Sequence, residues 1–339
     1  MTTEIEYLIQ KREGLNPTTK TNYINYYKRL RNLTEQDIRD MDNENLIEVI
    51  ETAQEPHRTT HELRDTPISV KQSFLNVAIV IKQIYNKDID ELITYRSEGT
   101  KKLVQANAVK NVELKETLPK VKDLIAFMNE RYDQGDYVAY IINYLILTFN
   151  TRNMDLNLTI VKDSKSVNDK DNWLVLRKDS VRYMRYEFKT ATTYECFENV
   201  VKSPKFINAV KEILKEQEST PLLKAGDKRI EKVSLNKFIS NRTYEKIGQA
   251  KYLKAILAEK DTLTKLEKIS SNRGTAIQTL IENYSPNFTD EIGKKAKEAK
   301  KSGCKGKVSV SGQERKAQKK KTKQEEIAKA QAEHNSESE

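Results

Sequence analysis

The chain has 339 residues, of which 37% are hydrophobic and 32% are charged, and its formal net charge is +10. This length suits about two domains, and the composition predicts a modest core beneath a heavily charged surface. No apolar run, Tyr144 to Phe149 included, is long enough to cross a membrane, and no secretion signal is recognisable. We therefore expect an intracellular protein that acts in a nucleus, a viral factory or a virion interior.

The few metal-ligating residues exclude further classes. Two cysteines, Cys196 and Cys304, and three histidines, His57, His61 and His334, are too few and too scattered for a disulfide framework or a zinc finger. No glycine-rich phosphate loop is present. We therefore expect neither a metal nor a nucleotide cofactor.

Residues 1–95 are predicted to form a helical domain. Pro17 follows a turn and opens a helix, and apolar residues then recur at three-to-four spacing in two stripes, which is typical of a helix bundle. The stripes consist of Tyr23, Tyr26, Tyr27 and Leu30, and of Phe74, Val77, Ala78, Ile81 and Ile84. Residues 96–113 have almost no aromatic residues and no strong period, which predicts a linker.

Residues 114–290 are predicted to form a second domain. A helix follows Leu118, and the segment 137–148 is apolar almost all round, which is typical of a buried helix. Strand-like composition then predicts a small antiparallel sheet, and helical patterns resume after it. The predicted strands are 172–176, 181–188 and 194–201, and the predicted later helices are 204–216, 234–247 and 253–282. The predicted fold class is therefore mainly α with a small antiparallel β-sheet.

Residues 291–339 are predicted to form a basic tail that is either disordered or a single helix. Between Lys294 and Lys323 there are thirteen Lys or Arg and two Glu. Such a tail attracts polyanions without reading sequence, and it is equally typical of a solvated extension. The composition, rich in Lys, Asn and Ile, also suggests an AT-rich genome such as that of a large DNA virus.

Four pieces of the sequence stand in a recognisable order. They are the helical opening Pro17 to Tyr23, the segment Thr148 to Leu156 with Arg152 and Asp155, the strand end Phe188-Lys189-Thr190, and the helical segment Ser270 to Ala276 with Arg273. Together they resemble the tyrosine recombinase, or phage integrase, family. The resemblance implies a helical core-binding domain followed by a mostly helical catalytic-type domain with a small sheet.

The resemblance also implies roles for individual residues in opening a DNA phosphodiester. Arg152 and Arg273 would hold the phosphate with their fork-shaped cations, Lys189 would protonate the leaving oxygen, and Asp155 would support Arg152. The implied partner is double-stranded DNA, bound by a homo-oligomer. Further expected DNA contacts are Lys20, Lys28, Arg29 and Arg31 in the first domain and Lys300, Lys301, Lys305, Lys319, Lys320 and Lys321 in the tail.

Each of these residues also has a purely structural interpretation. Arg152 could cap a helix end, Lys189 could be a surface lysine, and Arg273 could pair with Glu267 or Glu282.

The match to the family departs at two positions. Ser270 stands where the family has the His of its His-x-x-Arg motif, and no tyrosine follows Tyr284, which lies eleven residues after Arg273 and earlier than the family's nucleophile. Three explanations stay open: a degenerate cleavage centre, a tyrosine donated by another protomer, or use of Tyr284. The corresponding functions are a DNA-binding protein related to recombination or integration and an active recombinase. A non-enzymatic packaging or scaffold protein that binds through its tail is a further hypothesis.

Overall fold

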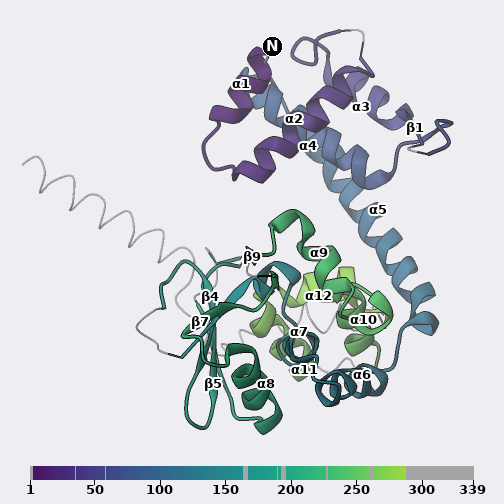
Figure 1. Cartoon of the computed structure of the whole chain (residues 1–339). Helices are drawn as coiled ribbons and strands as arrows, with labels where there is room; N and C mark the ends of the chain where they lie inside the picture. The colour runs from purple at the N-terminus through teal and green to yellow at the C-terminus, as the bar shows by residue number, and fades with distance from the viewer. Residues whose placement is uncertain are drawn as a thin grey trace, which may run out of the picture. The chain divides into compact units, whose positions relative to one another are not determined.

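The computed structural model describes residues 3–34, 36–57, 59–162, 167–188, 190–191, 196–226, 228–259 and 263–287 (Figure 1). The chain divides into unit 1, Met1–Lys110, and unit 2, Asn111–Glu339. No helix in the described part combines the length and apolar character that crossing a bilayer requires. Lys189 and the predicted tail, with its six candidate DNA-binding lysines, lie outside the described residues.

Unit 1 is a bundle of helices, as its apolar stripes predict. Thr3, Asn16 and Asp42 cap three of the helices by accepting a hydrogen bond from a backbone N–H of the first turn. The stripes meet in one core around the fully buried Phe74 and Leu30. The helices are α1 (Glu4–Lys11), α2 (Pro17–Arg31), α3 (Asn43–Thr52), α4 (Ile68–Ile84) and α5 (Asp90–Leu114).

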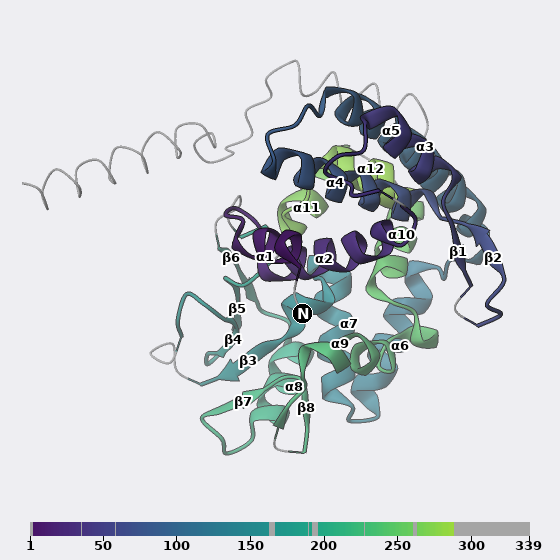
Figure 2. The same ribbon diagram turned by 90° about the horizontal axis from the view of Figure 1, so that it is seen from above.

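Two features of unit 1 differ from the prediction. A hairpin of β1 (Gln54–Pro56) and β2 (Leu63–Asp65) projects from the helices (Figure 2); its strands are too short for a sequence pattern. The interval 96–113, predicted as a linker, lies within the continuous helix α5. Its helical period is weak because that helix has no single apolar face.

The helical part of unit 2 surrounds the buried helix α7. Asp136 begins α7 by accepting a hydrogen bond from Ala139 N at 3.1 Å, and Asn150 ends it in the left-handed conformation, with φ of 52°. The helices are α6 (Val121–Asp133), α7 (Tyr137–Phe149), α8 (Pro204–Leu214), α9 (Lys232–Ser240), α10 (Gln249–Glu259), α11 (Leu263–Arg273) and α12 (Ile277–Tyr284), with short 3-10 turns η1 (Lys115–Thr117), η2 (Asn153–Leu156) and η4 (Tyr244–Lys246).

Two predicted helices of unit 2 prove shorter or divided. In the segment 234–247 the helix ends at Ser240, and Glu245 and Lys246 beyond it adopt positive φ, which is incompatible with a continuous helix. The segment 253–282 contains parts of three helices, α10, α11 and α12. The chain turns at Gly274, with φ of 58°, between α11 and α12.

The mainly helical class with a small sheet is confirmed, but the sheet of unit 2 is mixed rather than antiparallel, which corrects that part of the prediction. Its strand order is β6-β5-β4-β3-β7, and β3 runs parallel to β4. The sequence pattern does not reveal β3, because all four of its residues are buried and show no alternation. The strands are β3 (Leu158–Val161), β4 (Asn172–Leu176), β5 (Val181–Arg185), β6 (Phe197–Val201) and β7 (Ser219–Pro221); a separate hairpin joins β8 (Lys224–Ala225) and β9 (Lys228–Arg229).

The two faces of this sheet have different neighbours. Ile160, Leu174 and Tyr183 point to the main core, to which α7 and α8 contribute many of the other buried side chains. Trp173 and Met184, at alternate positions, belong to a small cluster on the other face. The carboxyl end of β5 therefore lies at the border of a rigid core, beside η2.

Candidate functional site: an arginine cluster

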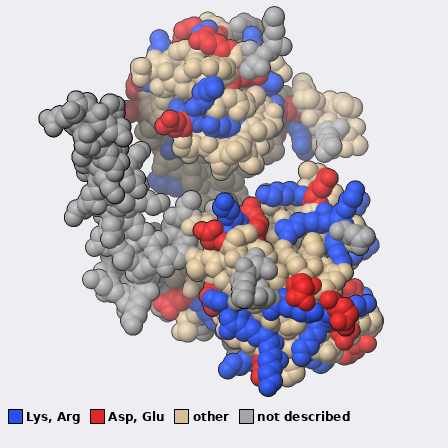
Figure 3. Space-filling model, turned by 60° about the vertical axis from the view of Figure 1, so that its left-hand side comes forward, with Lys and Arg blue, Asp and Glu red and all other residues tan. Residues whose placement is uncertain are grey.

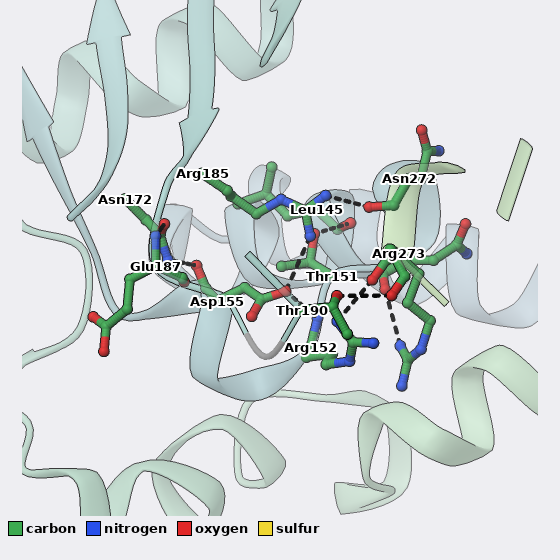
Figure 4. A network of polar contacts seen from close by, with 12 residues as sticks. Leu145, Thr151, Arg152, Asp155, Asn172, Arg185, Glu187, Thr190, Asn272 and Arg273 are labelled. Atoms are coloured by element: carbon green, nitrogen blue, oxygen red, sulfur yellow. Dashed lines mark hydrogen bonds and ion pairs between the residues drawn. The ribbon is translucent and has the colours of Figure 1, made fainter. Parts of the chain in front are cut away.

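Arg152 and Arg273 are brought together although 121 residues separate them in the sequence. Arg152 follows the left-handed turn that ends α7, and Arg273 is the last residue of α11. The guanidinium of Arg152 donates from Nη1 to the backbone oxygen of Arg273 at 2.7 Å and from Nη2 to Thr275 Oγ1 at 2.6 Å. The segments that carry Arg152 and Arg273, two of the four that the sequence singled out, thus meet at one place in the fold (Figure 4).

Arg273 is held from the other side. Its side chain is 2% exposed, and its Nη1 donates to the backbone oxygen of Asn150 and to Gln249 Oε1, both at 3.0 Å. Its guanidinium carbon lies 5.2 Å from the centre of the Tyr284 ring. Arg273 pairs with neither Glu267 nor Glu282 among the ion pairs of the described residues.

A third arginine, Arg185 at the end of β5, completes the cluster and was missed by sequence reasoning. Arg185 is 1% exposed and pairs with the fully buried Asp155, at 3.0 Å between Nη1 and Oδ2. Its Nη2 donates to the backbone oxygen of Asn272, and its guanidinium carbon lies 4.2 Å from the centre of the Phe197 ring. We name Arg152, Arg185, Arg273 and Asp155 the arginine cluster.

The backbone around the cluster is fixed by polar side chains. Asn172 on β4 donates to the backbone oxygens of Asp155 and Glu187 and accepts from the N–H groups of Tyr186 and Glu187. Thr190 donates to the backbone oxygen of Gly274 at 2.8 Å. The chain after β5, the turn η2 and the end of α11 are therefore joined by side-chain hydrogen bonds (Figure 4).

Positive charge exceeds negative charge inside the cluster. Asp155 is the only carboxylate that forms an ion pair with any of the three arginines within the described residues. Burial, together with the charge of Arg273, lowers the pKa of Arg152 below its ordinary value. Burial also raises the pKa of Asp155, although Arg185 and Arg152 oppose that effect. An anion placed beside Arg152 would relieve this excess of buried positive charge.

The three guanidinium groups also bind the carboxyl ends of helices. Arg152 and Arg185 donate to the last two carbonyls of α11, and Arg273 donates to the carbonyl that follows α7. Cations at these positions are favoured by the helix dipole. The structural interpretation of Arg152 as a residue that caps a helix end is therefore confirmed. This role uses only some of the N–H donors of its guanidinium.

The remaining candidates in unit 2 have distinct positions. Ser270 donates to the backbone oxygen of Thr275 at 2.7 Å and so shapes the turn between α11 and α12. Tyr284 is partly buried, with its ring against Arg273. In the described part of the chain, no group of three or more His, Cys, Asp or Glu is arranged to hold a metal.

The candidate DNA-binding residues of unit 1 differ in their availability. Arg29 forms a bidentate pair with Glu55 and lies over two aromatic rings, so its fork is occupied within the unit. Lys28 pairs with Glu6 at 3.3 Å, and Lys20 donates to the backbone oxygen of Gln10. Arg31 is exposed near the end of α2.

Basic residues also gather on the surface of unit 2. Residues 111–287 contain 30 Lys or Arg and 24 Asp or Glu, so this part is basic even without the tail. Figure 3 shows Lys and Arg side chains concentrated on one face of unit 2, with fewer acidic side chains among them.

No family model, curated protein or solved structure matches this chain.

Proposed function

We propose that the protein binds double-stranded DNA and that the arginine cluster holds one backbone phosphate. The observation that carries this proposal is the grouping of three arginines with one carboxylate. Arg152 donates to the backbone oxygen of Arg273, and Arg185 pairs with the buried Asp155. A non-titrating, fork-shaped cation in a partly buried place is the side chain best suited to a phosphate.

Unused donors give this cluster its capacity for an anion. Nε of Arg152 and both Nε and Nη2 of Arg273 have no hydrogen-bond partner among the described residues. The donors already in use fix the two guanidinium planes by bonds to the ends of α7 and α11. A phosphate would therefore meet preorganised groups rather than mobile side chains.

The order of the domains supports a relationship to tyrosine recombinases. A helical unit precedes a mainly helical unit with a five-stranded sheet, and Arg152 and Arg273, the two arginines on which the resemblance rests, lie close together. We propose a role in recombination or integration with a degenerate cleavage centre, because a serine occupies the position of the expected histidine. Assembly as a homo-oligomer on DNA stays a prediction.

The test of the proposal is duplex binding followed by fluorescence anisotropy over a range of salt concentrations. We expect affinity to fall steeply with salt and Arg152→Ala to weaken binding by about tenfold, equivalent to one charged hydrogen-bonded contact. Arg177→Ala, which removes an exposed arginine from the β4–β5 turn, is the matched control. Salt-independent affinity, or equal effects of both variants, would contradict the proposal.

A second candidate function is DNA strand cleavage by Tyr284. The observation that favours it is the contact between the Tyr284 ring and the Arg273 guanidinium, at 5.2 Å. In such a reaction the phenol oxygen would form a bond to phosphorus as the bond to the leaving DNA oxygen breaks, and that oxygen would take up a proton. We expect a protein–DNA adduct on a nicked duplex in a denaturing gel if this function exists. Adduct absent from wild type, or retained in Tyr284→Phe, would exclude Tyr284 as the nucleophile.

The tail supplies the remaining alternative, a packaging or scaffold protein without a phosphate clamp. Deletion of residues 290–339 separates the two accounts. If the shortened chain keeps binding that depends on Arg152, the clamp accounts for it. If all affinity is lost while unit 2 stays folded, the tail alone binds DNA.

A further inference from the structure

A polar cavity lies beside the arginine cluster, between α7, β6 and α11. Its volume is about 250 Å³. Lys202 and Asn199 contribute from the β6 side, and Lys268 and Asn272 contribute from α11, while Tyr144 and Phe149 belong to α7. None of the three clustered arginines lines this cavity, so it is a separate site.

The cavity has positive charge without a compensating acid. No Asp or Glu lines it, and both lysines are exposed at its margin. Neither Lys202 nor Lys268 forms an ion pair within the described residues. Other lysines of unit 2 do: Lys205 lies 3.6 Å from Asp133, and Lys232 lies 3.2 Å from Glu187.

The α11 side of the cavity presents two polar groups in one direction. Lys268 and Asn272 are four residues apart and therefore lie on the same face of the helix. The backbone oxygen of Asn272 accepts from Arg185, while its side chain points away from that contact (Figure 4). Because Arg152 and Arg185 occupy the last carbonyls of α11, the negative end of the helix dipole is offset at this site.

The size of the cavity limits what it can hold. It falls just below the range of ordinary ligand pockets, and aromatic residues of α7 back its polar margin. Lysine supplies point charges, and asparagine adds amide donors to an oxyanion. The Asn272 amide nitrogen donates one N–H to the backbone oxygen of Thr148, at 3.5 Å, and has a second N–H to offer. A compact, multiply charged oxyanion can accept from that N–H and from both lysines.

We propose that this cavity is a phosphate-binding site formed by Lys202, Lys268 and Asn272. The phosphate belongs either to a DNA backbone or to a small phosphorylated molecule. The site is independent of the proposed DNA clamp, because a free phosphate can occupy it without DNA.

The first test uses the full chain and inorganic pyrophosphate, with lysine acetylation measured residue by residue by mass spectrometry. This readout separates the cavity from the basic tail. We expect pyrophosphate to slow acetylation of Lys202 and Lys268 by about tenfold, as for occupancy near 90%, and to leave the exposed Lys178 and Lys211 little changed. If Lys202 and Lys268 are protected no more than these two control lysines, the cavity does not bind a free phosphate.

Paired variants test the assignment to these side chains. In the Lys202→Gln variant we expect pyrophosphate to protect Lys268 about tenfold less effectively. In the Lys268→Gln variant we expect the same loss of protection at Lys202. The control variant Lys211→Gln removes an equal charge and should leave protection at both sites intact. Undiminished protection in the two cavity variants would refute a shared site.

A duplex arm identifies the source of the phosphate. If DNA occupies the cavity, duplex will protect both lysines, and the double variant Lys202→Gln/Lys268→Gln will reduce the slope of log affinity against log salt by about 0.9 for the lost phosphate contact. Protection by pyrophosphate alone identifies a small phosphorylated ligand. Protection by neither probe overturns the proposal, whatever the outcome of the Arg152 experiment.

Discussion

The buried pair of Arg185 and Asp155 offers the sharpest test of how unit 2 is held together. Replacing Arg185 by Met keeps much of the apolar length of the side chain but leaves Asp155, which is fully buried, without its ion-pair partner. The backbone oxygen of Asn272 also loses its donor. Breaking one partner of a buried pair costs about 3–5 kcal/mol in the free energy of unfolding.

The companion variant is Arg185→Met/Asp155→Asn. Asparagine removes the uncompensated charge at nearly constant volume, so we expect this double variant to recover about half of the lost stability or more. For a unit of this size, the single variant should lower the melting temperature by roughly 2–4 °C per kcal/mol.

The loss of stability in the Arg185→Met variant should also depend on pH. Burial already raises the pKa of Asp155 in the wild type, and loss of Arg185 removes the largest opposing effect. The folded variant therefore takes up a proton at higher pH than the folded wild type. As pH falls from the Asp155 pKa of the variant to the lower Asp155 pKa of the wild type, the variant gains stability relative to the wild type. The difference in the free energy of unfolding therefore shrinks.

The assay is urea unfolding followed by fluorescence. The single tryptophan, Trp173, is buried in β4 and therefore reports on unit 2. The reasoning would be refuted by a deficit below about 1 kcal/mol, which is the range of surface ion pairs. A deficit that is the same at every pH, or a double variant no more stable than Arg185→Met, would refute it too.

Three further outcomes are expected. Asp136→Ala should cost about 1 kcal/mol of stability because it removes the cap of α7, whereas the exposed Asp133→Ala should cost less; urea unfolding compares them. Asn150→Ala should cost about 1–2 kcal/mol, since its φ of 52° disfavours alanine, and equal stability would show that the left-handed turn is dispensable. Burial raises the pKa of Tyr140, Tyr183 and Tyr252 to about 12, so in an alkaline absorbance titration these three should ionise after the exposed tyrosines. Stability that they contribute below pH 10 is lost as pH rises through 12, and ionisation of all tyrosines near pH 10 in the folded protein would contradict their burial.

The local patterns of the sequence were enough for much of the fold. The turn before Pro17 and the apolar character of the segment 137–148 predict helices at the places where the structure has them. These signals are local because a helix satisfies its hydrogen bonds within a few residues of itself. The family resemblance likewise singled out Arg152, Asp155 and Arg273, which are three of the four members of the arginine cluster.

The tertiary structure alone decided which groups meet. Arg185 looks like any strand arginine in the sequence, and its partners Asp155 and Asn272 lie 30 and 87 residues away. The parallel pairing of β3 with β4 is equally invisible, because a fully buried strand shows no alternation. The sequence by itself indicated most helices, the charge of the chain, and Arg152 and Arg273 as candidate site residues. Only long-range packing determined the ion pair between Arg185 and Asp155 and the guanidinium N–H groups left without a partner among the described residues.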